Sequence, residues 1–242
     1  MVLLKYRYDL HCHCKEASAC SVFPVEEMVK YYINEGLDGF CLTDHFDGNP
    51  TVRDNIPWKE RVDLYYECYE KALKAAEGTN LKVFSGLEFS LLRSGTKDIL
   101  SCTGNDFIIL GLTKEWVREN EEIFNLPYND FFDAIHEAGA FVIHAHPFWE
   151  HEVVDSIILV PRKVDAVEVY NSGTIDIENE RAEKYADDYN LTKVAGSDIH
   201  SNEWGILTGV ETEKKCETVY DLINEIKSGK TQIFKQRASR YL

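Results

Sequence analysis

Short β-rich segments alternate with helical segments along this chain of 242 residues, and this order limits the folds that it can adopt. Helices are expected from Val25, from about Trp58, near Asn129 and near Glu178. The β-rich segments are residues 5–13, 38–45, 82–90, 106–112, 140–147, 164–171 and 192–200. Such alternation predicts parallel strands joined by crossover helices, which is the pattern of an α/β fold.

No low-complexity linker, internal repeat or shift in composition divides the chain, so we expect one domain over residues 1–242. With 44% hydrophobic residues, a chain of this length can bury a substantial core without a partner. Pro24 before the first helix and Gly36 after it are typical start and stop signals. We expect irregular insertions at 92–105 and 150–162.

The chain is strongly acidic, with 42 acidic against 26 basic residues and a formal net charge of -16. Long-range repulsion argues against long nucleic acid and anionic membranes as partners. A small anionic substrate remains compatible, because bound divalent cations would reverse the local field.

The start of the chain lacks a signal peptide, and no stretch approaches the roughly 20 apolar residues of a membrane span, so we expect a cytoplasmic protein. Seven cysteines without a C-x-x-C pair predict mostly reduced, buried thiols.

Polar residues gather at the carboxyl ends of the predicted strands, where α/β barrels and open parallel sheets place their active sites. Six of the eight histidines occupy such ends, which a scattered surface population would not do. The residues concerned are His11, His13, Asp44, His45, Glu88, His144, His146, Asn171, Asp198 and His200.

Two pairs of these residues are spaced by two, so each pair points to one face of its strand. His11 and His13 can share one ion or adjacent ions, while the cysteines between and after them face the surrounding helices. Asp198 and His200 combine a carboxylate with an imidazole, which suits a hard or borderline divalent ion. Taken singly, the first pair could lack a metal, and Asp198 could cap a helix while His200 is exposed.

Glu88 follows an apolar strand, where an unpaired buried carboxylate would be costly. A metal relieves that cost, best if the carboxylate bridges two cations; a salt bridge to Arg93 is the alternative. In the LTDH segment His45 is the expected ligand, and Asp44 is either an orienting carboxylate or a helix cap.

The two histidines of FVIHAHPF lie on one face of their strand at different depths. His146 is nearer the predicted mouth and is the better ligand. His144 is as readily a structural imidazole. His136 and His151 are expected to be solvated or packed residues without a role in the site.

These motifs together resemble the PHP (polymerase and histidinol phosphatase) superfamily, through DLHCH, LTDH, GLEFS, AHPF, VEVYN and GSDIH in family order. The resemblance implies a single distorted (β/α)7 barrel of the TIM type with two or three divalent ions, Zn, Mn or Fe. It further implies that His11, His13, Glu88 and Asp198 hold the first ion, that Glu88 bridges to a second ion near His146, and that His45 and His200 serve a third.

The sequence departs from the family pattern at two places. Many members carry an acidic or histidine ligand for the third ion shortly after the H-x-H motif, and the segment CKEASAC offers Glu16 at a shifted spacing. Many also carry a histidine in the strand after the glutamate, where this chain has only Asn105 or Asp106 nearby. Glu16 is therefore the expected ligand of the third ion, and the alternative is an exposed glutamate in a polar segment.

The function implied is hydrolysis of a small phosphate ester, such as histidinol phosphate or a nucleotide, by a metal-bound hydroxide. Glu88, Asp198 and His146 are the expected catalytic residues, and Lys15, Arg53, Arg93 and Asn171 the expected substrate contacts. Two alternatives remain. One is an amidohydrolase-like enzyme for a C–N or acyl bond, although no lysine stands at a strand end for carbamylation. The other is a non-catalytic, metal-binding regulatory module.

Overall fold

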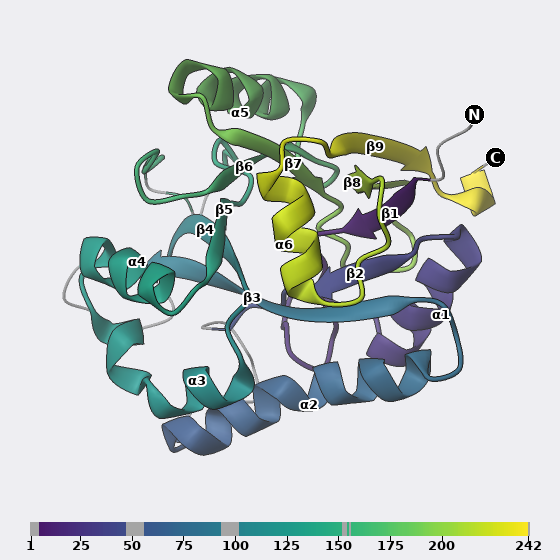
Figure 1. The fold of residues 1–242 in the computed structure, drawn as a ribbon, viewed down its shortest axis with the longest axis horizontal. Coiled ribbons are helices and arrows are strands. Elements are labelled where there is room, and N and C mark those ends of the chain that lie inside the picture. The colour runs from purple at the N-terminus through teal and green to yellow at the C-terminus, as the bar shows by residue number, and fades with distance from the viewer. Residues whose placement is uncertain (1–4, 47–55, 93–101, 152–153, 155, 242) are drawn as a thin grey trace.

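The computed structural model describes residues 5–46, 56–92, 102–151, 154 and 156–241 of the chain. One mixed sheet forms its centre, in the strand order β7-β6-β5-β4-β3-β2-β1-β8-β9 (Figure 1). The strands are β1 Tyr6–Asp9, β2 Gly39–Leu42, β3 Lys82–Leu92, β4 Cys102–Leu110, β5 Phe141–His144, β6 Ala166–Asn171, β7 Thr192–Gly196, β8 Ile206–Thr212 and β9 Gln232–Arg237.

The sheet curls so that its first and seventh strands meet just beyond their carboxyl ends. Cys12 and Ile199 form an isolated parallel bridge, and Asp198 N–H donates to the His11 carbonyl at 2.8 Å. Strands β1 to β7 therefore form a nearly closed barrel, with the β8–β9 hairpin added beside β1. This arrangement confirms the predicted α/β barrel class.

One predicted strand runs in an unexpected direction. The alternation predicted parallel strands throughout, and β1 to β3 and β5 to β7 are indeed parallel. Strand β4 is antiparallel to both of its neighbours, and no described helix lies between β3 and β4. The amino-terminal half of β4 consequently lies at the same end of the barrel as the carboxyl ends of the other strands.

Helices cover the outside of the barrel, and the predicted ones begin where they were expected. They are α1 Val25–Glu35, α2 Trp58–Ala76, α3 Lys114–Glu119, α4 Tyr128–Glu137, α5 Asp176–Tyr189 and α6 Val219–Lys227, with short 3-10 turns η3 Glu121–Asn125 and η4 Ser239–Tyr241. Gly36 ends α1 in the left-handed conformation, which is a favoured stop. In Figure 1, α5 lies beside β6 and β7 at the top, and α2 runs along the opposite side. None of the helices in the described residues is long and apolar enough to cross a membrane.

Two apolar layers hold the barrel together. The inner layer joins residues of β1 to β8 with Leu222, Ile223 and Ile226 of α6, so this helix closes one end of the barrel. At this end the Tyr220 hydroxyl donates at 2.8 Å to the carbonyl of Gly111, which follows the carboxyl end of the antiparallel strand β4. The opposite mouth is left to polar residues. The outer layer contains Cys12 and Cys14, which face the helices as the strand alternation predicted.

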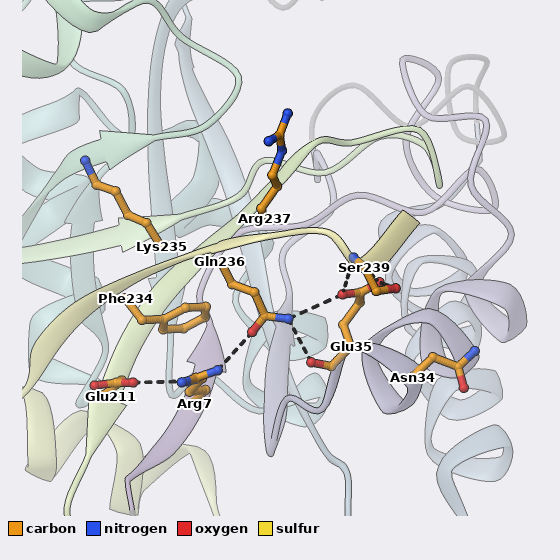
Figure 2. Close-up of a pocket in the computed structure, with 9 residues that line it drawn as sticks. All are labelled: Arg7, Asn34, Glu35, Glu211, Phe234, Lys235, Gln236, Arg237 and Ser239. Atoms are coloured by element: carbon orange, nitrogen blue, oxygen red, sulfur yellow. Dashed lines mark hydrogen bonds and ion pairs between the residues drawn. The ribbon is translucent and has the colours of Figure 1, made fainter. Parts of the chain in front are cut away.

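A pocket of about 580 Å³ lies between α1, β1, β8 and β9, away from that mouth (Figure 2). Arg7 donates to Glu211 at 3.0 Å and to Gln236 at 2.9 Å. Gln236 in turn donates to the Glu35 carbonyl at 2.8 Å, and Ser239 donates to the Glu35 carboxylate from its N–H and its hydroxyl. These donor–acceptor pairs fasten the end of the chain to α1.

Candidate metal centre

The carboxyl ends of the strands bring the predicted polar residues to one mouth of the barrel. An isolated bridge between His45 and Glu88 extends the pairing of β2 with β3, as the bridge at Cys12 extends β1. The candidate ligands that meet there are His11, His13, His45, Glu88, His146, Asp198 and His200. They come from the loops or ends of β1, β2, β3, β5 and β7.

The first group of donors is His11, His13 and Asp198. Asp198 Oδ1 lies 3.1 Å from His13 Nε2 and 3.5 Å from His11 Nε2. The two Nε2 atoms are 3.0 Å apart. Two imidazole nitrogens and one carboxylate oxygen around one point suit a borderline divalent cation.

Glu88 lies between this group and a second one, formed by His11, Glu88 and His146. Its Oε1 is 3.2 Å from His11 Nε2 and 3.3 Å from His146 Nε2. Its Oε2 is 2.8 Å from His45 Nδ1 and 3.5 Å from His13 Nε2. A carboxylate whose two oxygens face different nitrogens has the arrangement of a ligand shared between cations.

Asp106 adds a carboxylate beside the second group. Because β4 is antiparallel, this residue near its amino end reaches the mouth, with Oδ2 3.9 Å from His146 Nε2. Burial raises the pKa of Asp106 to about 6. Its neighbour Asn105 donates to the Ser156 carbonyl at 2.9 Å. Of the two residues that stand where many relatives have a histidine, Asp106 is thus the one that approaches the cluster.

A third group lies at the rim and includes a cysteine that the sequence reasoning passed over. It consists of His13, Cys20, His45 and His200, whose candidate ligand atoms all lie within 4.8 Å of one another. Cys20 Sγ is 3.1 Å from His200 Nε2. The groups packed around the Cys20 thiol partly desolvate it and oppose its ionisation, but contacts with His200 and His45 outweigh this and lower its pKa to about 7. The signal was in the sequence, as the last residue of CKEASAC.

Behind the cluster, Glu168 of β6 fixes the ring of His11. Its Oε1 lies 3.1 Å from His11 Nδ1, and its Oε2 accepts from the His146 N–H at 3.0 Å. Asn171 donates to Glu168 Oε2 at 2.9 Å and to Asp198 Oδ2 at 3.2 Å. Asn171, predicted to contact substrate, is fully buried and orients carboxylates. Glu168 was missed, although a glutamate within an apolar strand was visible in VEVYN.

A second support involves Asp44, which had been expected either to orient a ligand or to cap a helix. Ser18 donates its hydroxyl to Asp44 Oδ1 at 2.6 Å, and that oxygen also accepts from the Cys14 N–H at 2.7 Å. His13 Nδ1 lies 3.2 Å from the Ser18 hydroxyl oxygen. Since the hydroxyl hydrogen is used by Asp44, this oxygen is free to accept from His13. Asp44 therefore orients His13 through Ser18.

The buried charges at the mouth depend on one another. Burial opposes a charge on His11, but three neighbouring carboxylates outweigh it and raise the pKa of His11 well above its ordinary value. Burial likewise opposes the charge on Glu88, while the surrounding histidines hold the pKa of Glu88 well below its ordinary value. Burial and neighbouring histidines lower the pKa of His13 to about 3. His13 is therefore neutral, the form in which an imidazole binds a metal.

The donor set fits divalent metal ions. Glu88 Oε2 is fully buried, and its 2.8 Å contact with His45 Nδ1 lacks hydrogen-bond geometry, so this oxygen has no hydrogen-bond partner among the described residues. His11 Nε2 and His13 Nε2 face each other at 3.0 Å and can share only one hydrogen. Lone pairs that converge in a buried space are costly unless a cation lies between them.

The backbone is bent at two of the candidate ligands. His146 and Asp198 have φ values of 24° and 54°, a region that few residues other than glycine adopt. Just before Asp198, Gly196 ends β7 where a Cβ atom would lie 2.3 Å from Glu168 Oε1 and 2.4 Å from His11 Cβ. Glycine is therefore required for β7 to pass this close to the first group.

Glu16 does not occupy the place predicted for it. Its Oε2 accepts from the Val25 N–H at 3.1 Å, so Glu16 caps α1 and belongs to none of the possible metal-binding groups in the described residues. A carboxylate bound at a helix N-terminus satisfies a free N–H and the helix dipole, which explains why the loop folds this way. The structure therefore does not bring Glu16 to the residues that were expected to hold the third ion with it.

Other predicted residues lie outside the cluster. Lys15 is exposed, and no contact joins its side chain to the cluster within the described ranges. Arg53 and Arg93 lie outside the described residues. His144 is buried, stacks on Phe107 with ring centroids 4.6 Å apart, and has no hydrogen-bond partner on either ring nitrogen in the described structure. His136 pairs with Asp165 and His151 stacks on Trp149, so neither joins the site.

Solved structures share this fold at low sequence identity. The chain is similar to a two-domain protein from Bacteroides vulgatus that contains a predicted PHP-like metal-dependent phosphoesterase, at 19% identity and a TM-score of 0.65, covering 96% of this chain and 65% of that one. PsfC from Pseudomonas syringae gives 16% identity and 0.65, covering 95% and 91%. An amidohydrolase from Chromobacterium violaceum gives 14% and 0.53, covering 96% and 98%. None of the curated proteins matches the chain.

Family models describe most of the sequence. The PHP domain model matches residues 9–190, which include every candidate ligand except Asp198 and His200. A second model, described as PHP-associated, matches residues 176–231 and includes those two. The structure has the barrel with histidines and carboxylates gathered at one mouth. Because the PHP domain model matches most of the sequence, this chain belongs to the PHP domain family.

Proposed function

We propose that this protein is a metal-dependent phosphoesterase that hydrolyses a small phosphate ester, such as histidinol phosphate or a nucleotide. The observation that carries the proposal is Glu88, whose oxygens lie 3.2 Å from His11 and 2.8 Å from His45 on its two sides. Neighbouring cations that share a carboxylate are a recurrent arrangement for hydrolysis at phosphorus.

Some of these residues would bind the cations, and others orient the side chains that bind them. His11, His13, Glu88 and Asp198 would hold one divalent cation, and Glu88 with His146 would hold another, with Asp106 nearby. Cations bound there would lower the pKa of a water molecule and neutralise charge on the phosphoryl group. Glu168 and Ser18 keep His11 and His13 turned toward the centre through their Nδ1 atoms.

The mouth suits an ester with a compact organic group. Trp149 lies beside His146, with ring centroids 5.6 Å apart, and Trp204 lies beside His200 at 5.8 Å. Both tryptophans are half-buried, and His151 stacks on Trp149 with ring centroids 4.7 Å apart. Trp204 is fixed by a hydrogen bond from its ring N–H to the Ser197 carbonyl at 2.8 Å.

Hydrolysis of a C–N bond is less well supported by the residues. Many enzymes of the amidohydrolase type use a carbamylated lysine at a strand end. In the described part of the chain no lysine pairs with a candidate ligand, and Lys82 at the start of β3 pairs with Glu217 instead. A non-catalytic module would have no need of so nearly complete a donor set.

The test is a substrate panel on protein freed of metal and reloaded with Zn²⁺, Mn²⁺ or Fe²⁺. The panel comprises p-nitrophenyl phosphate, its diester, histidinol phosphate, nucleoside monophosphates and N-acyl amino acids, with Glu88→Gln as the control for contaminating phosphatases. We expect metal-dependent release from at least one phosphate ester, lost in Glu88→Gln. Turnover of only the N-acyl substrates, or of none, would overturn the proposal.

A further inference from the structure

The rim group differs from the inner groups because it contains a thiol. Cys20 Sγ lies 3.1 Å from His200 Nε2, and the Cys20 side chain also contacts the ring of His45. These three residues come from separate parts of the sequence and converge around His13. His13 stacks on both imidazoles, with centroid distances of 4.6 Å to His45 and 4.5 Å to His200.

His200 of the rim is oriented by a hydrogen bond at its other nitrogen, and His45 is placed by an ion-pair contact and by its backbone. His200 Nδ1 lies 2.7 Å from the Asp198 carbonyl oxygen, which can only accept, so Nδ1 carries the hydrogen. Nε2 then presents its lone pair toward Cys20. His45 Nδ1 faces Glu88 Oε2 at 2.8 Å, and its backbone N–H donates to Ser18 at 3.0 Å. Histidines that bind metals are commonly fixed in this way by a carbonyl or a carboxylate.

Cys20 is placed as a ligand would be and not as a packing residue. It is exposed, whereas Cys12, Cys14, Cys41, Cys68 and Cys216 are buried. His45 and His200 are half-exposed, so an ion could enter from solvent. Glu88 Oε2, buried and without a hydrogen-bond partner among the described residues, lies behind His45 and adds negative charge on the inner side.

We propose that Cys20 supplies a thiolate ligand, beside the imidazoles of His45 and His200, for the third divalent ion that the family resemblance implies, and that this thiolate makes the rim site select zinc or ferrous iron over manganese or magnesium. Thiolate and imidazole are softer ligands than carboxylate and water, and so disfavour the harder ions. Three protein ligands leave a position open, as in catalytic zinc sites. On binding, the thiol S–H bond is replaced by a sulfur–metal bond, and the proton passes to solvent.

The proposal rests on the proposed function only in placing this ion beside the inner centre, and its test detects the thiolate directly. Full-length protein is loaded with Co²⁺ as a spectroscopic probe for zinc. We expect a near-ultraviolet thiolate-to-cobalt charge-transfer band in the wild type and in Cys216→Ala, which removes a buried thiol of the inner apolar layer. Cys20→Ser should lose the band and one equivalent of cobalt while its circular dichroism stays unchanged.

A second measurement does not depend on a variant that folds. Iodoacetamide should alkylate Cys20 in the metal-free wild type, and Zn²⁺ should protect it while Mg²⁺ does not. His200→Asn should weaken the zinc concentration dependence of this protection by ~100-fold or more, since even outer partners of a ligand are worth about 10- to 100-fold.

Two results would overturn the rim site. One is a charge-transfer band that persists in Cys20→Ser, and the other is a wild type that binds cobalt without any such band. Either result leaves the phosphoesterase proposal intact, because the inner ligands would still bind cobalt. A wild type that binds no cobalt at all would contradict both proposals.

Discussion

Two polar regions of this molecule look alike in composition and differ in how their groups are paired. In the pocket of Figure 2, donors meet acceptors: Arg7 meets Glu211 and Gln236, and Gln236 and Ser239 meet Glu35. At the barrel mouth, imidazole nitrogens and carboxylate oxygens crowd together, and Glu88 Oε2 among them has no hydrogen-bond partner in the described structure. A network in which every hydrogen bond is made stabilises a surface, whereas converging acceptor atoms that lack hydrogen-bond partners indicate a place for a cation.

The strongest way to break this comparison is to remove one carboxylate from each region. We expect Glu88→Gln to lose at least one metal equivalent and to slow hydrolysis ~100-fold or more, above the about 10- to 100-fold cost of losing an outer partner. The matched change Glu211→Gln should keep full metal content and alter the free energy of unfolding by ~1 kcal/mol or less. Elemental analysis and steady-state kinetics measure both, and equal metal loss in the two variants would contradict the distinction.

The two histidines at the carboxyl end of β5 allow a similar comparison within a few residues. His146 faces Glu88 at 3.3 Å, whereas His144 packs between Phe107 and Tyr185. We expect His146→Ala to abolish hydrolysis with a modest loss of stability. His144→Leu should keep the metal content and most of the activity. The reverse result would show that the centre lies one side-chain layer deeper.

Removing a support should have an intermediate effect. Glu168→Gln keeps the shape behind His11 but weakens the acceptor of its Nδ1–H, so we expect metal affinity or kcat to fall about 10- to 100-fold. Glu178→Gln is the control, because that buried carboxylate accepts only from the backbone of Ile175 and Glu150 in the described structure. Titration of each variant with Zn²⁺ gives the comparison, and identical curves would show that Glu168 does not position His11.

His144 also predicts a pH dependence of stability. Burial lowers the pKa of His144 to about 3 in the folded protein, against about 6.5 in an unfolded chain. Between these values the unfolded state binds the proton and the folded state does not, so stability falls as pH decreases from about 6.5 towards 3. His144→Leu should lose this part of the slope. Urea unfolding of the metal-free proteins at several pH values tests it, and parallel slopes would contradict it.

The smallest effect is expected at Glu16. Since its carboxylate caps α1, Glu16→Ala should cost ~1 kcal/mol of stability, as the loss of a helix cap does, and leave every metal equivalent in place. Thermal unfolding and elemental analysis check the two parts. Loss of one metal equivalent would restore Glu16 as a ligand.

Residues that alternate along a strand could be located from sequence because the period of two fixes their face. His11 and His13 converge as this rule requires, and the helices begin at the expected residues. Asp198 and His200 also reach the mouth, but from the turn after β7, where the left-handed backbone of Asp198 lies outside the rule. What the rule cannot give is which way a strand runs. Asp106 reaches the mouth only because β4 is antiparallel, a property of the whole sheet.

Ligands in loops were harder to predict from the sequence than ligands at strand ends. Between the H-x-H motif and α1 the chain offered both Glu16 and Cys20, and residue type alone favoured the carboxylate. The competing demand of the α1 N-terminus decided otherwise, since Glu16 binds Val25. Glu168 was overlooked because an orienting residue does not stand at a strand end.

The left-handed backbone at His146 and Asp198 limits which sequences can preserve this centre. Aspartate, asparagine and histidine are among the few residue types enriched at positive φ, and two of them are also metal ligands. Glutamate at 198 would supply the same oxygens from a backbone that it rarely adopts. A replacement at either position must therefore meet two requirements: its side chain must bind a metal, and its backbone must adopt a positive φ. The change Asp198→Asn distinguishes the two requirements, because asparagine also adopts a positive φ readily but lacks the negative charge of the carboxylate.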